Sequence, residues 1–230
     1  YMPLATEFKD AAWFNPMNGD IDKAAINNGK VRIRLRSGES AILQTYRNGN
    51  QNEPTHNDVI NPSKTEIKLT KHKWQLSFVE EAPKVSKTFN LDSLQYWQNL
   101  DSETSVTMGT GVYTTTVKLN STQSKIHWSI NLGDVRESAR VYINGEFIGC
   151  AWAVPYILDC KNLLHKGDNI IRIEVTNLPA NRISNLDKKG VKWRKMKEIN
   201  IVDLNYQKTT YANWKPIDSG LNNVTLTTDN

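Results

Sequence analysis

Residues 139–150 read ARVYINGEFIGC, and this stretch decides the fold class. Apolar side chains alternate with polar ones on both sides of Asn144-Gly145, as they do in strands that bury one face. The pair Asn-Gly favours a tight turn between two antiparallel strands. The stretch therefore predicts a β-hairpin.

Further strands are expected on both sides of this hairpin, where β-branched residues and alternating polarity recur between turn signals. They cover residues 73–79, 111–119, 125–132 and 169–176. Strands at such regular spacing predict an all-β fold, an antiparallel jelly-roll β-sandwich, and argue against a parallel α/β sheet. Helix signals are scarce, and only residues 91–100 and 188–197 suggest short helical turns.

The N-terminal part of the chain is expected to form a smaller β-rich appendage. Alternation over residues 31–36 and 41–46, on either side of a Ser-Gly-Glu-Ser turn, predicts a second hairpin. The polar stretch 51–63 contains two prolines and marks the best candidate for a boundary. We therefore expect residues 1–62 to be the remnant of a preceding domain and residues 63–230 to form the jelly-roll domain.

Composition excludes several classes of protein. A chain of 230 residues with 38% hydrophobic residues is long enough for one sizeable core. The sequence has no apolar stretch of about 18 residues, so no membrane span is expected, and its first residues lack a signal-peptide pattern. Cys150 and Cys160 are too few for a disulfide scaffold and lack metal spacing, so two free, buried thiols are expected.

The net charge of +5 comes from 29 basic and 24 acidic residues, and much of it lies in a basic run over residues 188–197. Such a run beside aromatic residues could follow a phosphate backbone. A solvated surface is the better interpretation, because charge runs usually face water. We therefore expect no nucleic-acid partner.

No catalytic constellation is visible. The four histidines are scattered, and the sequence lacks nucleophile, phosphate-binding and zinc motifs. A glycosidase needs two carboxyls on opposite sides of a sugar, but Glu80 and Glu81 are adjacent and would point to opposite faces of a strand. Asp101 and Glu103 lie in a loop, where they could be solvated or hold calcium. The chain is therefore expected to have no catalytic residue, and calcium is the only cofactor left open.

Sugar recognition suits this composition better, because aromatic faces stack on pyranose rings and amide or guanidinium groups bond their hydroxyls. Of the seven tryptophans, Trp74 and Trp128 lie in alternating strands and are expected in the core. Trp152 leaves a strand and enters a proline-limited turn with Tyr156, where it either binds a ligand or plugs the end of the sandwich. Trp193 with Trp214 is a second possible aromatic platform.

A polar loop, residues 177–182, directly follows the last strong strand. Its asparagines, Asn177 and Asn181, either contact a ligand or cap loop backbone, and Arg182 either pairs with a neighbouring domain or is exposed. Loops at strand ends are held by the scaffold yet free to touch a partner. We define the strand-end rim as the predicted carbohydrate or interdomain contact surface. It consists of Trp152, Tyr156, Asn177, Asn181 and Arg182.

The block from Gly133 to Gly145, continuing through Trp152 and Pro155 to residues 167–182, resembles the galactose-binding-like jelly roll at the end of bacterial α-L-rhamnosidases of glycoside hydrolase family 106. Family 2 sugar-binding domains are the next relatives. Shorter matches lie at residues 15–19, 37–40 and 109–114, and around Ser219-Gly220-Leu221. The tail departs from the family pattern, because Asn222 and Asn223 stand where Leu-Gly-Pro would be usual.

The resemblance implies a non-catalytic accessory domain of a larger, secreted or periplasmic glycoside hydrolase that degrades plant polysaccharide. Its partners would be carbohydrate and the catalytic barrel of the parent chain, and no catalytic residue can be carried over to this sequence. Two alternatives stay open: a free-standing carbohydrate-binding module, and a structural β-sandwich without a ligand.

Overall fold

The computed structural model describes residues 1–49, 65–195, 204–205 and 209–228. Within these residues it is an all-β antiparallel sandwich with a smaller β-rich N-terminal unit, and every strand pairing is antiparallel. The predicted fold class is confirmed. The domain boundary expected at residues 51–63 lies outside the described residues.

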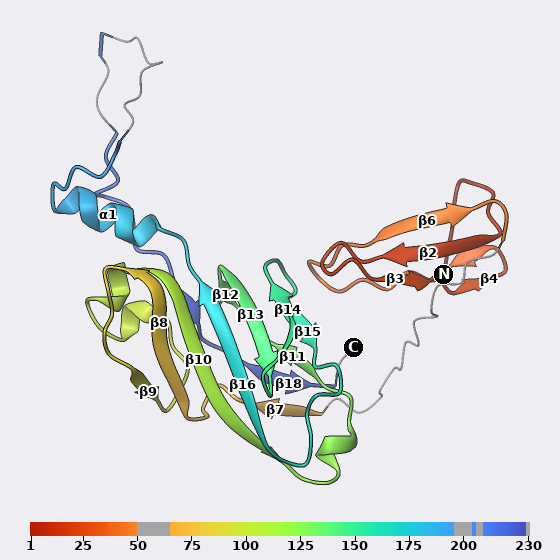
Figure 1. Ribbon diagram of the computed structural model, residues 1–230. Coiled ribbons are helices and arrows are strands. Elements are labelled where there is room, and N and C mark those ends of the chain that lie inside the picture. Colours follow the sequence, from red (N-terminus) through yellow and green to blue (C-terminus); the bar gives the residue numbers. More distant parts are fainter. Residues whose placement is uncertain (50–64, 196–203, 206–208, 229–230) are drawn as a thin grey trace.

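One layer of the sandwich is a six-stranded sheet with the order β14-β13-β16-β10-β8-β9 (Figure 1). The hairpin predicted at 139–150 is present, and Asn144 and Gly145 at its turn have φ angles of 52° and 90°. The strands of this sheet are β8 (Trp74–Ala82), β9 (Phe89–Leu91), β10 (Met108–Leu119), β13 (Ser138–Ile143), β14 (Glu146–Ala151) and β16 (Gly167–Thr176).

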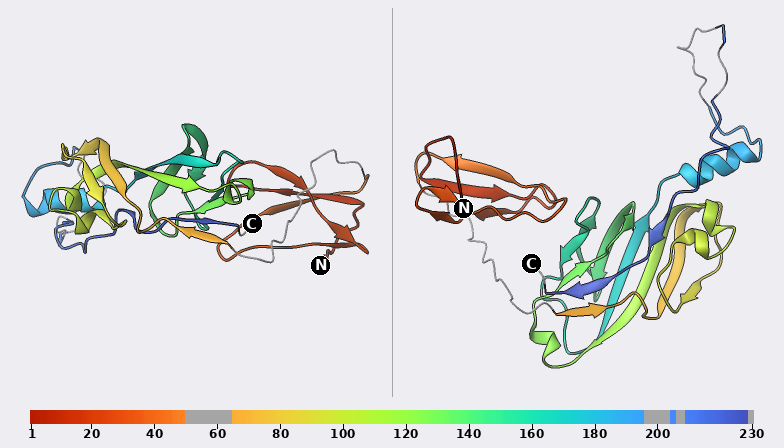
Figure 2. Two further views of the ribbon diagram at one scale, coloured as in Figure 1. Left: turned by 90° about the horizontal axis from the view of Figure 1, so that it is seen from below. Right: turned by 180° about the vertical axis from the view of Figure 1, so that it is seen from behind.

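The other layer is a four-stranded sheet with the order β15-β11-β18-β7, and Figure 2 shows it from behind. A short pair, β12 with β17, closes one end of the sandwich. These strands are β7 (Glu66–Lys68), β11 (Ser129–Asn131), β12 (Val135–Arg136), β15 (Ile157–Asp159), β17 (Gly220–Leu221) and β18 (Thr225–Thr227). Strand β11 is thus shorter than the stretch predicted at 125–132, because the 3-10 turn η3 (Gln123–Lys125) extends to Lys125 and residues 126–128 belong to neither element.

The core lies between these two sheets and is built from the inward side of each alternating strand. Trp74 and Trp128 are 1% exposed, as their alternating contexts predicted. Both indole nitrogens donate to backbone carbonyls, of Leu69 and Gln123, so the rings are buried without an unpaired donor. Cys160 is buried as expected, whereas Cys150 is only partly buried because it lies on the outward side of β14.

A buried polar contact fixes the end of the sandwich next to β17. The Trp97 indole donates to the Tyr113 hydroxyl at 2.7 Å, and that hydroxyl also accepts the backbone N–H of Leu221 at 3.2 Å. Both rings are 0% exposed. Gly220 and Gly111 make room for this contact, because a Cβ at either position would lie 2.3 Å and 2.6 Å from atoms of the Trp97 ring.

Three short helical turns and one α-helix complete the sandwich. The 3-10 turn η1 (Trp97–Asn99) lies within residues 91–100, where a short helical turn was expected. The 3-10 turn η2 (Thr104–Val106) lies just beyond that segment. The α-helix α1 (Ala180–Lys188) covers residues that were predicted as loop, and it ends where the second turn, 188–197, was expected to begin. No helix in the described part of the chain has the length and hydrophobicity needed to cross a bilayer.

The N-terminal unit contains two three-stranded sheets, β1-β5-β4 and β3-β2-β6. The hairpin predicted over residues 31–46 is wrong: β5 pairs with β1 and β4, and β6 pairs with β2, so the two halves belong to different sheets. Of the predicted strand 31–36 only Val31 is a strand residue and residues 32–36 form none, so alternating polarity alone does not make a hairpin. The strands are β1 (Met2–Pro3), β2 (Asp10–Phe14), β3 (Ile21–Lys23), β4 (Ile26–Asn27), β5 (Lys30–Val31) and β6 (Ile42–Tyr46).

The Trp97–Tyr113 contact leads to a first prediction. Gly220→Ala should lower the free energy of unfolding by about 3 kcal/mol or more, because the new methyl group overlaps two buried rings at a positive φ angle. Gly145→Ala is the matched control, since Gly145 has a similar φ angle but open space around it; about 1 kcal/mol is expected there. Urea denaturation measures both, and equal losses would contradict the steric argument.

Candidate functional site

Trp152 and Asn177 lie at the same end of the six-stranded sheet. The register pairs Ala139 with Ala151 on one side and with Val175 on the other, so β14 and β16 end together. Trp152 directly follows β14 and is 54% exposed. In the part of the chain that the structure describes, no cation lies over its ring.

Tyr156, the second aromatic residue of the strand-end rim, is partly buried. It precedes β15, packs against the core, and its carbonyl accepts the backbone N–H of Leu132 at 2.9 Å. The chain reaches it through the segment that starts at Trp152. Tyr156 thus anchors that segment, and Trp152 is its exposed part.

The amide of Asn177 is engaged inside the chain. Its oxygen accepts the backbone N–H of Gly109 at 3.0 Å, and its nitrogen donates to the carbonyl of Thr107 and the hydroxyl of Ser219. The residue is 8% exposed. Asn177 therefore ties β16 to the start of β10, the loop-capping alternative left open by the sequence.

Asn181 plays a similar part from within α1. Its amide nitrogen donates to the carbonyl of Ile217 at 2.8 Å, and its oxygen accepts the N–H of the same residue at 3.0 Å. The buried residues of α1 are Asn181 and Ser184, both polar. Sequence patterning missed this helix for that reason, because the pattern that reveals a helix is an apolar stripe. Arg182, one position further along α1, is partly exposed.

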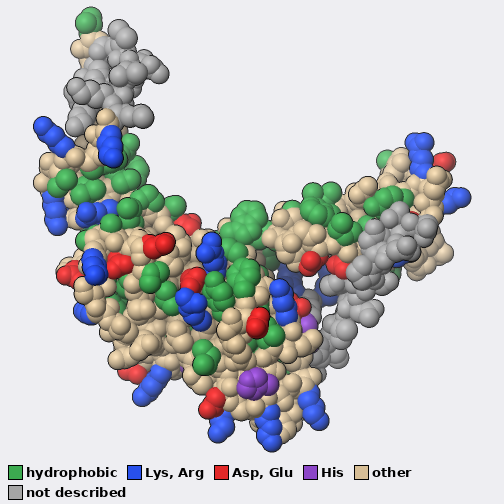
Figure 3. Space-filling view, viewed as in Figure 1, with side chains coloured by type: hydrophobic (Ala, Val, Ile, Leu, Met, Phe, Trp, Pro, Cys, Tyr) green, Lys and Arg blue, Asp and Glu red, His purple; other side chains and the backbone are tan. Residues whose placement is uncertain are grey.

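Other exposed apolar side chains lie at this end of the sandwich, at the ends of β10 and β16 and in the segment after β14. Met108 begins β10, Leu178 follows the end of β16, and Val154 lies two residues beyond Trp152; they are 36%, 46% and 54% exposed. We call Met108, Trp152, Val154 and Leu178 the apolar edge. Figure 3 shows hydrophobic side chains along the edge of the sandwich between α1 and the N-terminal unit.

The N-terminal unit reaches one end of the apolar edge. A Cβ placed on Gly38 would lie 2.8 Å from a methyl group of Val154, and Gly38 has a φ angle of 82° that favours glycine. The loop around Gly38 is thus in close contact with the segment after β14. This contact links the two parts of the chain at the strand-end rim.

A second aromatic group lies at the C-terminal end of α1, where Asp187 organises it. The carboxylate of Asp187 accepts the backbone N–H of Tyr211 at 2.7 Å and the indole N–H of Trp193 at 2.6 Å, and these bonds lower its pKa. Trp214 packs on Tyr211 with ring centroids 4.4 Å apart. The Arg194 guanidinium lies 4.8 Å from the Tyr211 ring centroid.

We call Trp193, Arg194, Tyr211 and Trp214 the aromatic platform. Trp214 is 48% exposed, so part of the group faces solvent. The sequence suggested Trp193 with Trp214, but not the parts of Tyr211 and Asp187, because the bond from Tyr211 to Asp187 spans 24 residues of chain. Lys197 of the basic run lies outside the described residues.

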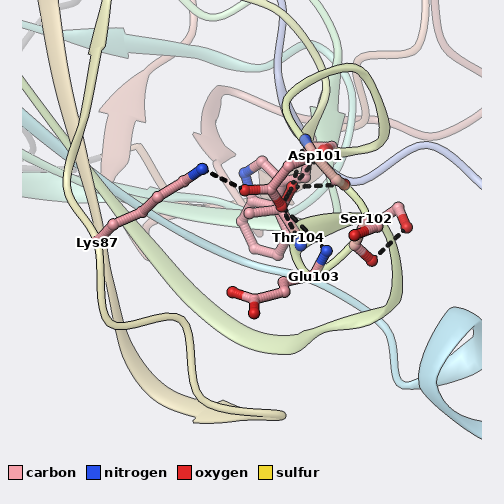
Figure 4. Close-up of polar contacts among 7 residues, drawn as sticks. Lys87, Asp101, Ser102, Glu103 and Thr104 are labelled. Atoms are coloured by element: carbon pink, nitrogen blue, oxygen red, sulfur yellow. Dashed lines mark hydrogen bonds and ion pairs between the residues drawn. The ribbon is translucent and has the colours of Figure 1, made fainter.

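The Asp101 carboxylate, considered above as a calcium ligand, is occupied by protein groups (Figure 4). It accepts the backbone N–H groups of Glu103 and Thr104, the Thr104 hydroxyl, and the ammonium of Lys87 at 2.7 Å. Thr104 in turn donates to the carbonyl of Trp97. Burial would raise the pKa of Asp101, but the bonds from Lys87 and Thr104 outweigh it and lower the pKa to about 2. Asp101 therefore stabilises the turn that carries η2.

No cluster of three or more histidine, cysteine, aspartate or glutamate side chains is present in residues 1–49, 65–195, 204–205 and 209–228.

This fold and this end of the sandwich define a class, the galactose-binding-like β-sandwiches of glycoside hydrolases. A family model described as glycosyl hydrolase 2 galactose-binding domain-like matches residues 90–220. The chain therefore belongs to the galactose-binding domain-like family of glycosyl hydrolase 2. The resemblance to glycoside hydrolase sandwiches is confirmed.

Individual relatives agree with this assignment. A protein of Formosa agariphila, named as a proposed beta-glucuronidase, is 27% identical over 157 residues, which are 63% of this chain and 13% of the relative. A rhamnosidase structure from Novosphingobium sp. PP1Y superimposes with a TM-score of 0.70 at 22% identity, covering 96% of this chain and 21% of that one. The likeness to the rhamnosidase structure shows that the two chains share a fold. This chain spans only a small part of either protein.

The Asp101 turn leads to a second prediction. Asp101→Asn should lower the free energy of unfolding near neutral pH by about 1–2 kcal/mol. The effect is smaller than the pKa shift alone implies, because the Lys87 side chain is 57% exposed. A lowered carboxyl pKa contributes stability that is fully present above about pH 4 and is lost as the pH falls through about 2.

The difference between Asp101→Asn and the native chain should therefore shrink as the pH falls from about 7 to about 2.5. Urea titrations at several pH values measure it. Glu103→Gln is the control, because the neighbouring Glu103 side chain is exposed and should change stability little. A difference that grows on acidification would contradict the assignment.

Proposed function

We propose that this chain is a non-catalytic accessory domain of a longer glycoside hydrolase, and that its strand-end rim packs against the catalytic domain. One observation carries this: the apolar edge exposes four large apolar side chains at one end of the sandwich. Grouped exposed apolar residues mark protein contact sites. A sugar site would instead present free polar groups, yet Asn177 and Asn181 have their amides engaged within the chain.

The proposal extends to the organisation and setting of the parent protein. Residues 1–62 would be the remnant of a preceding domain, and residues 63–230 would form the galactose-binding-like jelly-roll domain. The coverage of the relatives supports a longer parent protein, because this chain spans only 13% and 21% of the two relatives compared above. The parent enzyme would act on plant polysaccharide outside the cytoplasm, in line with the relatives named as glycoside hydrolases.

Catalysis is assigned to the parent rather than to this chain. The purified chain should not hydrolyse an aryl rhamnoside or an aryl galactoside, since no carboxyl pair suited to a glycosidase was found in its sequence. Turnover that disappears when one of its own carboxylates is replaced would overturn this assignment.

Trp152→Ala tests the docking role. In the isolated chain it should change the free energy of unfolding by less than about 1 kcal/mol, because the ring is already more than half exposed. In the complete parent enzyme it should lower the thermal midpoint by several degrees, because the ring is buried there. Differential scanning calorimetry of both proteins measures this contrast.

Phe147→Ala is the matched control, because Phe147 is 51% exposed but lies on β14 away from the apolar edge. It should affect both proteins alike. If Trp152→Ala has no larger effect in the parent than in the isolated chain, the rim is not the docking surface.

A second candidate function, binding of polysaccharide, is favoured by the aromatic platform. Trp214 is half exposed and packs on Tyr211, whose ring also lies near the Arg194 guanidinium, and aromatic and guanidinium groups together can stack on sugars and bond their hydroxyls. Affinity electrophoresis through plant polysaccharides should then retard the chain, and Trp214→Ala should abolish the retardation. Trp152→Ala serves as the control, and equal retardation of the native chain and Trp214→Ala would exclude the platform.

A further inference from the structure

A cleft of about 360 Å³ lies between α1 and the segment that carries η2. Ser184, Asn185 and Lys188 line it from the helix, Val106 lines it from η2, and Pro216 lines it from the segment before β17. None of these residues belongs to the apolar edge or to the aromatic platform. The cleft is therefore separate from both of these groups of residues.

Two side-chain polar atoms beside this cleft have no hydrogen-bond partner. They are the Ser184 hydroxyl and the Asn185 amide nitrogen, both inaccessible to solvent. Ser184 as a whole is 6% exposed. Buried polar groups without partners are rare because leaving them unpaired costs free energy, so each calls for an explanation. A group that enters the cleft and bonds them is the explanation that their position favours.

The other polar residues around the cleft are satisfied. Asn181 exchanges two bonds with Ile217, and the hydroxyl of Ser105 donates to the carbonyl of Ser102 at 2.8 Å. Around the cleft, the polar atoms without a hydrogen-bond partner thus belong to Ser184 and Asn185, which are adjacent residues on α1. A change of rotamer brings either polar atom to the cleft, because both side chains line it.

The chemistry of the cleft selects its occupant. The amide nitrogen of Asn185 and the ammonium of Lys188 only donate, and the Ser184 hydroxyl can donate as well, so the occupant must supply acceptors and favours a negative charge. Val106 and Pro216 add an apolar wall suited to the C–H face of a sugar ring. The volume is many times the roughly 30 Å³ of one water molecule and falls in the range of small-ligand sites.

We propose that this cleft binds a carboxylate-bearing sugar residue, that is, a uronic acid unit of a polysaccharide. Lys188 pairs with the carboxylate, and Ser184 and Asn185 bond ring or carboxylate oxygens. The cleft shares Asn181 with the strand-end rim, but the three residues that bind the sugar lie outside the rim, so the site goes beyond the docking role proposed for the rim.

The test uses the whole 230-residue chain and two probes, methyl β-glucuronide and methyl β-glucoside, which differ in the carboxylate. Saturable binding of the glucuronide, followed by two-dimensional NMR, should perturb amides of α1 and η2, with weaker binding of the glucoside. Ser184→Ala should weaken glucuronide binding about tenfold by removing a hydrogen bond to a charged group. Its thermal midpoint should be unchanged or higher, because the unpaired hydroxyl is gone.

Lys188→Gln should reduce the preference for glucuronide over glucoside about tenfold. Lys189→Gln is the matched control, since Lys189 is the next exposed lysine and does not line the cleft. Trp214→Ala should leave glucuronide binding unchanged, which separates this site from the aromatic platform.

Absence of saturable binding would overturn the proposal. So would binding that Ser184→Ala and Lys188→Gln leave intact, or an equal effect of Lys188→Gln and Lys189→Gln. None of these outcomes bears on whether the rim docks on a catalytic domain, which the Trp152 and Phe147 variants test.

Discussion

The buried bond from the Trp97 indole to the Tyr113 hydroxyl is the contact on which the functional end of this domain depends. The same hydroxyl accepts the N–H of Leu221, and Ser219 accepts the N–H of Trp97, so the segment before β18 is held against β10. Because a side chain at Gly220 would occupy the space of both rings, only glycine allows this approach. The position of one short segment, 217–221, follows from this contact.

That segment then positions the residues next to it. Ser219 bonds Asn177 at the end of β16, and Ile217 exchanges two bonds with Asn181, which sets α1 against the sandwich. On its other side, Trp97 accepts the hydroxyl of Thr104, whose turn is closed by Asp101. Both walls of the cleft beside α1 are therefore positioned by bonds that involve Trp97. Asn177 and Asn181, for which the sequence left open either ligand contact or capping of loop backbone, hold the scaffold around that cleft through their amides.

Much of the sandwich was predictable because its strands alternate strongly and its best turn is Asn-Gly. Residues 139–150 form the expected hairpin, and the strands near 111–119 and 169–176 pair as neighbours. Trp152 was predicted at a strand end from the turn limited by Pro155, and it is exposed there. The N-terminal hairpin was predicted wrongly, because residues 32–36 alternate in polarity without forming a strand and β6 pairs with β2 instead.

The sequence by itself determined the fold class, the alternating faces that fill the core, and the absence of familiar catalytic motifs, because these are properties of local pattern and composition. Only the tertiary structure decided which polar groups are free. Asn177 and Ser184 look equally available in the sequence, yet one has three partners and the hydroxyl of the other has none. The partners come from segments tens of residues away, so hydrogen-bond satisfaction is a property of the folded chain that local pattern cannot encode.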